Sequence, residues 1–546
     1  MGAGPSEAVE SLPHSLSAVP FAAVSPSRRD RVGIAAIGLL AVAYVLPFSG
    51  LGWNQGAHYA QIEALSHGTG RVDAYRWQSG DLALYHGHYY STKAPGVAFL
   101  GEPFYLLFRA TGLLGLVSRH TPSAWAAAQV VIWALAVCVV VVASAALLLT
   151  VRSVAERVAP GYGTATSLTL GLGTLVLPFS TVLFSHVPSG AFAFGAFALV
   201  ARFGDASPSR RRLALAGVLA GFGVCVEYTL AIVCAVLALY VVAAAGDRLQ
   251  RLGAYLAGAA LGVSPLLIYD RLVYGSFTHV SYANAIGASG GRRFVGENAR
   301  GLFGVSVPHL TTAFSLLFDS RGLLVTAPVF ALGVVGLVLM ARSGLRAETL
   351  ACGGILLAFL VLNAGYFLPF GGAAPGPRLL VPALPFFAPP LALAYRRFPA
   401  ATLMLALASA LVLLCATATK PMLGSGDTSV WATDLGKGAM RETVLAAAGV
   451  RGLAGAAPFL LAALAACAVL VLAVPQVPLP PRALVLPAVA LALWIGVAAA
   501  ADNAAGAGWR AVALAAGAAI LAACAPLALA PARSRLHRAP AATLSA

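Results

Sequence analysis

Charged residues are scarce in this chain of 546 residues. Only 10% of the residues are Asp, Glu, Lys or Arg, 60% are hydrophobic, and the mean hydropathy is +0.86. A soluble protein of this size needs more polar side chains to cover its surface. The composition therefore excludes a soluble globular protein and predicts an all-α polytopic membrane protein.

Cysteine is also rare, and its positions exclude two kinds of site. All seven cysteines lie inside apolar segments, and none lies in a polar loop. We therefore expect neither a disulfide framework nor a Cys-x-x-Cys metal site, and we interpret the cysteines as small core residues.

Lysine is the scarcest charged residue, with three lysines against 32 arginines, and the net charge is +16. The basic residues form short clusters between apolar segments instead of one basic domain, which excludes a nucleic-acid-binding domain. The clusters are Arg28/Arg29/Arg31, Arg152/Arg157, Arg210/Arg211/Arg212, Arg248/Arg251, Arg342/Arg346, Arg396/Arg397 and Arg533/Arg535/Arg538. Arginine-rich short connections favour the cytoplasmic side of a membrane, so we expect all of them there.

The apolar segments between these clusters are long enough to cross a membrane, for which a helix needs about 20 apolar residues. They lie near residues 32–52, 124–150, 162–183, 185–203, 211–227, 228–246, 253–275, 322–343, 349–370, 379–396, 400–417, 455–475, 483–500 and 509–531. We expect roughly 11 to 14 transmembrane helices, with both termini in the cytoplasm.

One apolar segment, residues 97–117, carries Glu102 and Arg109, and letting it cross would move the next arginine clusters to the outer side. We expect it to be re-entrant or to lie along the interface. The expected organisation is a disordered cytoplasmic tail over residues 1–27, a transmembrane module over 28–417 with its first outer loop at 53–123, an outer loop over 418–454, C-terminal transmembrane helices over 455–532 and a cytoplasmic tail over 533–546.

The same topology places three long polar stretches on the outer side, at residues 53–102, 270–321 and 420–451. Two shorter outer turns join them, at residues 185–188 and 370–378. The first stretch holds four of the 19 acidic residues of the chain and four of its ten histidines. Such a concentration of scarce polar residues predicts chemistry at the outer surface.

Several pieces of sequence resemble a known family in their order along the chain. They read GDLALYHGHYYSTKAPG, FSHVPSGAF, FGVSVPHLTTAFSLLFDSRGLLVTAPVF and FGGAAPGPRLLVPALPFF. The two most specific motifs are Tyr-x-x-Lys-x-Pro-Gly at Tyr90–Gly96 and Gly-Pro-Arg-x-Leu-x-Pro at Gly376–Pro382. Over about residues 30–400 the chain resembles the GT-C superfamily of polyprenyl-phosphate-sugar-dependent glycosyltransferases, in particular the bacterial relatives of protein mannosyltransferases and aminoarabinose transferases (glycosyltransferase family 39).

The resemblance implies a GT-C-type membrane enzyme with a long first outer loop. It implies inverting transfer of a sugar from a polyprenyl-phosphate donor to a glycan, lipid or protein on the outer face of a bacterial plasma membrane. Such a donor leaves an anion behind, and a cation must neutralise it. Lys93 and Arg378 lie in the two motifs and on the outer side, so they are the candidate phosphate-binding residues. The alternatives are a solvated loop lysine and an arginine that only reaches the membrane interface.

The acceptor hydroxyl must lose a proton, which calls for a base. In the resembled family this base is an acidic residue just after the first span, where the chain instead has Trp53-Asn54-Gln55. Amides cannot act as the base, so the role passes to Asp81, Asp73 or Glu63, each of which could equally form an ordinary loop ion pair. Asp81 and Asp73 are the two preferred candidates.

Other polar residues are candidates for contacts with the donor or acceptor: His86, His88, His186, Tyr90, Asn54, Glu63 and Glu227. A divalent metal between histidines and aspartates is conceivable, but a His-x-His spacing directs the two side chains of a strand to opposite faces, so hydrogen bonding to phosphate or sugar is preferred. Tyrosines such as Tyr90 could stack on sugars or belong to an interfacial belt. Glu227 could instead pair with a nearby arginine.

Two other functions stay open. A flippase for lipid-linked sugars would also bind phosphate, but it would use ionisable residues near the middle of its spans, which are nearly free of charge here. A non-catalytic accessory subunit of a glycosylation complex is compatible with the missing acidic residue after the first span.

Overall fold

The computed structural model describes residues 28–48, 50–204, 207–243, 247–287, 297–424 and 428–475, together with residues 489, 492 and 496. The predicted tails and the predicted spans at 483–500 and 509–531 therefore lie outside the described residues or almost entirely so. The described chain is mostly α-helical with three short strands, which confirms the all-α class.

The chain forms an α-helical bundle with a β-hairpin after α2 and a third strand after α12. The α-helices are α1 (Arg28–Val45), α2 (Trp53–Ser66), α3 (Gly96–Ala110), α4 (Leu113–His120), α5 (Ala124–Ala136), α6 (Val142–Val158), α7 (Gly163–Leu172), α8 (Val176–Phe179), α9 (His186–Val200), α10 (Arg210–Val226), α11 (Ala231–Ala243), α12 (Arg248–Tyr274), α13 (Leu310–Phe318), α14 (Leu323–Thr326), α15 (Val329–Arg342), α16 (Arg346–Gly365), α17 (Ala388–Arg397), α18 (Pro399–Ala418), α19 (Ser429–Gly436) and α20 (Gly452–Ala473). The strands are β1 (Asp81–Tyr85), β2 (His88–Ser91) and β3 (Ala285–Gly287). Short 3-10 or π turns are η1 (Asp73–Gln78), η2 (Val137–Val141), η3 (Tyr228–Leu230), η4 (Ser281–Asn284), η6 (Glu297–Ala299), η7 (Arg378–Phe387) and η8 (Val444–Ala448).

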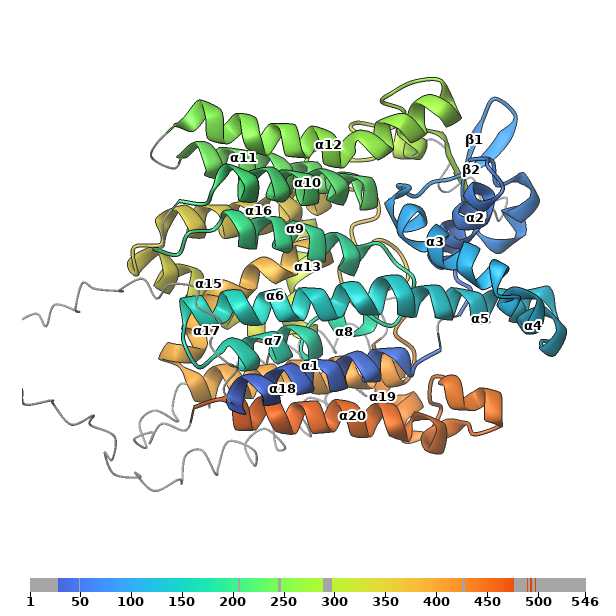
Figure 1. Ribbon diagram of the computed structural model, residues 1–546. Helices are drawn as coiled ribbons and strands as arrows, with labels where there is room; N and C mark the ends of the chain where they lie inside the picture. The colour runs from blue at the N-terminus through green and yellow to red at the C-terminus, as the bar shows by residue number, and fades with distance from the viewer. Residues whose placement is uncertain are drawn as a thin grey trace, which may run out of the picture.

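The long helices run side by side, and the two ends of the bundle differ (Figure 1). One end carries α2, the β1–β2 hairpin, α3, α4 and α19, and of these α2, the hairpin and α19 belong to the polar stretches of the sequence. The connections with arginine clusters, such as those between α6 and α7 and between α15 and α16, lie at the other end. The polar loops and the connections with arginine clusters thus lie at opposite ends of the bundle.

Six described helices are long and apolar enough to cross a membrane, or eight if each of two bent helix pairs forms one span. The expected count of 11 to 14 is therefore not confirmed. Several predicted spans are shorter or broken helices: α9 has 15 residues, α10 has 17, and the segment predicted at 162–183 is interrupted after the ten residues of α7. The segment predicted as re-entrant forms α3 and α4, which are bent by 76° where they meet.

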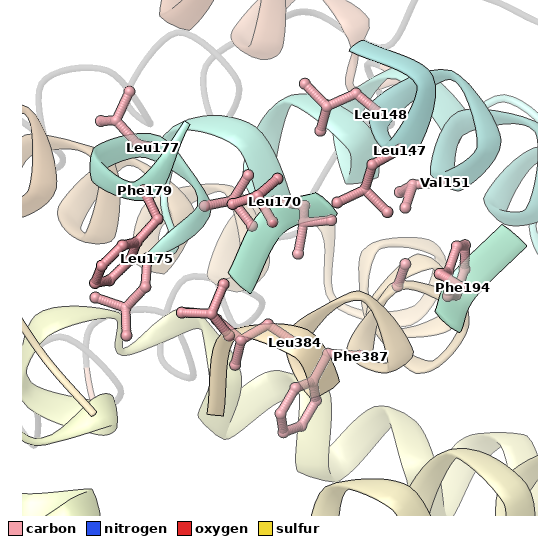
Figure 2. Close-up of a cluster of buried hydrophobic side chains, with 14 of the residues drawn as sticks. Leu147, Leu148, Val151, Leu170, Leu175, Leu177, Phe179, Phe194, Leu384 and Phe387 are labelled. Atoms are coloured by element: carbon pink, nitrogen blue, oxygen red, sulfur yellow. The ribbon is translucent and has the colours of Figure 1, made fainter. Parts of the chain in front are cut away.

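The interruption after α7 lies in the middle of the protein core. Figure 2 shows Leu170, Leu175, Leu177 and Phe179 of this region packed among side chains of α6, α9 and η7. Broken backbone at membrane depth needs internal hydrogen-bond partners because lipid supplies none. The hydroxyl of Tyr44 donates to the carbonyl of Gly171 at 2.7 Å, which is one such partner.

Small residues allow α10 and α12 to pack closely. A Cβ atom on Gly258 of α12 would lie 2.0 Å from the carbonyl oxygen of Ala214, and one on Gly217 of α10 would lie 2.0 Å from that of Tyr255. Close backbone contact through small residues is a common way to join helices in membranes. This pair matters for the site because the end of α10 leads directly to Glu227.

The substitution Gly258→Ala is expected to destabilise the protein by about 1–3 kcal/mol, because the added methyl group has no space against α10. Gly253→Ala on the same helix is the matched control, since nothing lies within 4 Å of the Cβ position there. Thermal unfolding in detergent should show a lower melting temperature for Gly258→Ala only. Equal melting temperatures for the two variants would contradict the packing argument.

Candidate functional site

A three-stranded sheet in the order β2-β1-β3 organises the first polar loop. The β1–β2 hairpin turns at His86 and Gly87, which both have positive φ, of 48° and 79°. Positive φ at both central residues is the backbone that a two-residue hairpin turn favours. The register pairs Leu82 with Ser91, so the start of β1 lies beside the residues that follow β2.

This register brings Asp81 and Lys93 together. The Nζ atom of Lys93 lies 2.9 Å from Oδ2 of Asp81, and the two side chains are 10% and 27% exposed. The backbone N–H of Thr92 donates to the carbonyl of Asp81 at 3.3 Å, which holds the residue before Lys93 next to Asp81. Burial alone would raise the pKa of Asp81, but Lys93 and Arg378 outweigh it, and the net pKa lies below its ordinary value of 3.8.

Gly96, the last residue of the Tyr-x-x-Lys-x-Pro-Gly motif, lets the start of α3 touch the end of α10. A Cβ atom there would lie 2.5 Å from backbone atoms of Cys225 and Val226. Only glycine fits this contact without a shift of one helix. The motif therefore brings Lys93, three residues earlier, close to the turn that carries Glu227.

Glu227 forms a buried pair with His186, the first residue of α9. The Nδ1 atom of His186 lies 3.0 Å from Oε2 of Glu227, and the side chains are 5% and 13% exposed. The hydroxyls of Ser185 and Ser189 donate to the same oxygen at 3.3 and 3.2 Å. Burial raises the pKa of Glu227, but His186 and the two hydroxyls reverse the direction and lower it.

Arg378 approaches from the Gly-Pro-Arg motif at the start of η7. Its guanidinium lies 5.4 Å from the ring centre of Phe184 and donates to the carbonyl of Ala373 at 3.4 Å. Its Nε atom is buried and has no hydrogen-bond partner among the described residues. Gly371, with φ of 77°, leaves room for this side chain, because a Cβ atom there would lie 2.5 Å from Nε.

The charged groups and His186 line one cavity of about 1020 Å³ at the polar end of the bundle. Asp81, Lys93, His186, Glu227 and Arg378 reach it from four separate regions of the chain. Its polar lining also includes Asn54, whose Oδ1 atom is buried without a partner in the described part of the chain. A cavity of this size holds a ligand as large as a sugar phosphate.

The cavity is electropositive. Its lining has four lysines or arginines, Lys93, Arg378, Lys420 and Arg441, against two carboxylates, Asp81 and Glu227. Arg441 is partly buried, and its observed hydrogen bonds go to neutral oxygens of Phe48 and Thr181 at 2.8–3.2 Å. Burial lowers the pKa of Arg441 to about 10, so it stays charged at neutral pH. The excess of positive charge favours an anionic ligand.

Several predicted site residues are not among those that line the cavity. Asp73 accepts hydrogen bonds from the backbone N–H of Tyr89 at 2.8 Å and from His88, whose Nδ1 lies 3.0 Å away. Asp73 and His88 therefore stabilise the hairpin. His86 occupies the hairpin turn and stacks on Tyr85. Tyr90 is buried against Tyr274 in an aromatic cluster below the sheet.

Glu63 also lies away from the cavity lining. It accepts hydrogen bonds from Gln78 and from the hydroxyl of Tyr105, the latter at 3.1 Å. Burial raises the pKa of Glu63. Its partners hold α2 against η1 and α3. Of the three acidic candidates for the base, only Asp81 therefore faces the cavity.

A metal site has no support in the described residues, which contain no group of three or more His, Cys, Asp or Glu side chains placed to hold an ion. Other lining residues were not predicted from the sequence, among them Tyr282, Tyr366 and Arg441. They lie in polar stretches expected on the outer side or next to one, yet no motif distinguishes them from their neighbours. Only the folding of distant loops against each other brings them to the cavity.

No protein-family model and no curated protein matches the chain. Among solved structures, the chain is similar to ArnT from Cupriavidus metallidurans bound to undecaprenyl phosphate, with 14% identity, a TM-score of 0.48, and coverage of 91% of this chain and 79% of ArnT. The apo form of ArnT gives 15% identity, a TM-score of 0.47 and coverage of 90% and 76%. The oligosaccharyltransferase of Archaeoglobus fulgidus gives 13% identity, a TM-score of 0.39 and coverage of 80% and 56%.

All three TM-scores are below 0.5. Identities of 13–15% assign neither a substrate nor a reaction to this chain.

The Asp81–Lys93 pair predicts a pH-dependent contribution to stability. Because the folded-state pKa of Asp81 is lowered, the contribution is fully present above the unfolded value of 3.8 and is lost as the pH falls through the folded value. Thermal unfolding in detergent should show wild type more stable than Asp81→Asn near neutral pH, with the difference shrinking below about pH 4. Asp73→Asn, on the same loop, controls for loss of a half-exposed aspartate that is paired with His88 instead of a lysine. A difference that stays constant from pH 7 to pH 3 would contradict the assignment.

Proposed function

We propose that this chain is an integral membrane glycosyltransferase that moves a sugar from a polyprenyl-phosphate donor to an acceptor hydroxyl. The observation that carries the proposal is the meeting of Lys93 and Arg378, 285 positions apart, at one electropositive cavity. They come from the two motifs that resemble GT-C glycosyltransferases. A single displacement of the phosphate by the hydroxyl inverts the configuration at the anomeric carbon.

The two cations suit a phosphate that gains charge as the glycosidic bond breaks. The ammonium of Lys93 has three N–H donors, so it can keep its contact with Asp81 and still bind a phosphate oxygen. Arg378 has a buried Nε without a partner in the described residues, and a guanidinium can bind phosphate through two parallel hydrogen bonds. Fixed cations in a partly buried site stabilise the leaving group more than water does.

An apolar part of the cavity suits the lipid chain of the donor. Leu302, Phe303 and Phe367 line it, and Leu302 and Phe303 are exposed large apolar side chains, at 67% and 44%. An isoprenoid chain could lie against them while its phosphate meets Lys93 and Arg378. The acceptor could be a glycan, a lipid or a protein.

The orientation of the site follows from the distribution of arginine. The connections that carry the described arginine clusters lie at the end of the bundle opposite α2 and the β1–β2 hairpin (Figure 1). Since such clusters favour the cytoplasm, we place the cavity on the outer face of a bacterial plasma membrane. A flippase is the less favoured function, because the charges gather beside an outer cavity and the predicted spans are nearly uncharged at mid-depth.

The proposal predicts that Lys93→Ala and Arg378→Ala each weaken binding of undecaprenyl phosphate about 10-fold to 100-fold, the usual range for the loss of a hydrogen bond to a charged group. Lys437→Ala is the matched control. Lys437 belongs to the polar stretch 420–451, and its side chain does not line the cavity. Binding is measured on detergent-purified protein with labelled undecaprenyl phosphate.

Transfer itself is tested in membranes that contain the wild-type protein, using a panel of radiolabelled polyprenyl-phosphate sugars. Label should leave the donor for another product, and free polyprenyl phosphate should appear in equal amount. If no donor loses sugar above the level of membranes without the protein, the glycosyltransferase proposal fails. Normal binding of undecaprenyl phosphate in that case would favour the accessory subunit or the flippase.

A further inference from the structure

The proposed reaction needs a base, and Asp81 is poorly suited to that role. Its carboxylate already binds Lys93 at 2.9 Å, and Arg378 lies close enough to lower its pKa further. A carboxylate stabilised as the anion by two cations accepts a proton weakly. Asp81 is better suited to hold Lys93 in position for the phosphate.

The pair of His186 and Glu227 has the arrangement that a base requires. Nδ1 of His186 lies 3.0 Å from Glu227, whereas Nε2 is buried and has no hydrogen-bond partner among the described residues. His186 is 4% exposed, and both residues line the cavity. A carboxylate at Nδ1 keeps the proton on that atom and leaves the lone pair of Nε2 free.

Glu227 is held in place by further donors. The hydroxyls of Ser185 and Ser189 reach Oε2, and that of Thr229 lies 3.5 Å from Oε1. Hydrogen bonds to the charged form keep a carboxylate ionised even when it is buried. Glu227 can therefore stabilise the positive charge that His186 gains when it accepts a proton.

We propose that His186, oriented by Glu227, is the general base of the glycosyl transfer; this rests on the function proposed above. The acceptor oxygen attacks the anomeric carbon as its proton moves to Nε2 of His186. The bond between that carbon and the phosphate oxygen breaks, and polyprenyl phosphate leaves with the electron pair. His186 then releases the proton to solvent.

This assignment accounts for the amides after the first span. Asn54 lines the same cavity as His186, and its buried Oδ1 can accept a hydrogen bond from a sugar or acceptor hydroxyl. The base is then supplied from α9 and the turn after α10, on another part of the cavity wall. An acidic side chain at position 54 is not required.

The other titratable groups around His186 come from three elements. His58 on α2 is fully buried, and neither of its ring nitrogens has a partner among the described residues. Burial, then Lys93 and His186, hold the pKa of His58 well below its ordinary value, so it is neutral. Lys93 follows β2, and Arg378 and His186 both pack on Phe184. Lys93 and Arg378 are positive charges at the cavity near His186, and Glu227 is the negative charge that contacts its ring.

The test compares His186→Gln, Glu227→Gln and Asp81→Asn with wild type, and uses His120→Gln, on exposed α4, as the control. His186→Gln is expected to lower kcat about 100-fold or more, the range for loss of a general base, with undecaprenyl phosphate bound as in wild type. Asp81→Asn should instead weaken undecaprenyl phosphate binding. His120→Gln should leave both unchanged.

The pH profile of kcat separates a base from a structural residue. Wild-type kcat should fall as the pH is lowered from about 8 to 5, the range in which histidines ordinarily titrate. In Glu227→Gln the fall should move to lower pH, because the carboxylate that favours the protonated imidazole is gone. The kcat of Asp81→Asn should still fall as the pH is lowered.

Three results would overturn the inference: wild-type kcat that does not fall with pH, folded His186→Gln with normal kcat, or Asp81→Asn without turnover but with normal donor binding. If His186→Gln does not fold, the profiles of wild type and Glu227→Gln decide. If the wild type transfers sugar and His186→Gln and Glu227→Gln have the same kcat and pH profile as the wild type, only this inference is refuted. Absence of transfer from every polyprenyl-phosphate sugar refutes the proposed function itself.

Discussion

The structure depends on the cost of burying charge. A charged side chain away from water is tolerated only with a partner, and this chain has few charges to place. At the cavity, two carboxylates are used in two close pairs, Asp81 with Lys93 and Glu227 with His186. Arg378, Lys420 and Arg441 remain, and in the described structure the hydrogen bonds of the two arginines go to neutral oxygens. The pairing leaves a surplus of positive charge beside the cavity, and this surplus favours an anionic ligand.

Close backbone contacts hold this arrangement together. Gly96 fits against the end of α10, and Gly217 and Gly258 join α10 to α12, so the turn with Glu227 is fixed relative to the first polar loop. Strand β3 then ties the segment after α12 to β1. Positioning is most of what a transfer site contributes, and rigid packing supplies it. The interrupted helix α7–α8 below the site is kept inside the core, where its free backbone groups find partners.

The two acidic pairs also differ in the chemistry that they can support. Asp81 faces two cations and stays a weak base, whereas Glu227 faces an imidazole whose second nitrogen is free. Two carboxylates in one cavity thus serve different groups because their neighbours differ. In the proposed reaction, a chain that lacks the acidic residue of the resembled family after its first span still offers a base.

The sequence by itself determined the class of protein, most helix positions and the separation of arginine clusters from polar loops, because apolar length and charge are local properties of the chain. It also directed attention to Lys93 and Arg378 through short motifs. The tertiary structure decided which of the polar candidates meet. The hairpin register joined Asp81 to Lys93 and kept Asp73 with His88, and the approach of α9 to the end of α10 paired His186 with Glu227. Such meetings depend on packing between segments up to hundreds of residues apart, and no local pattern records them.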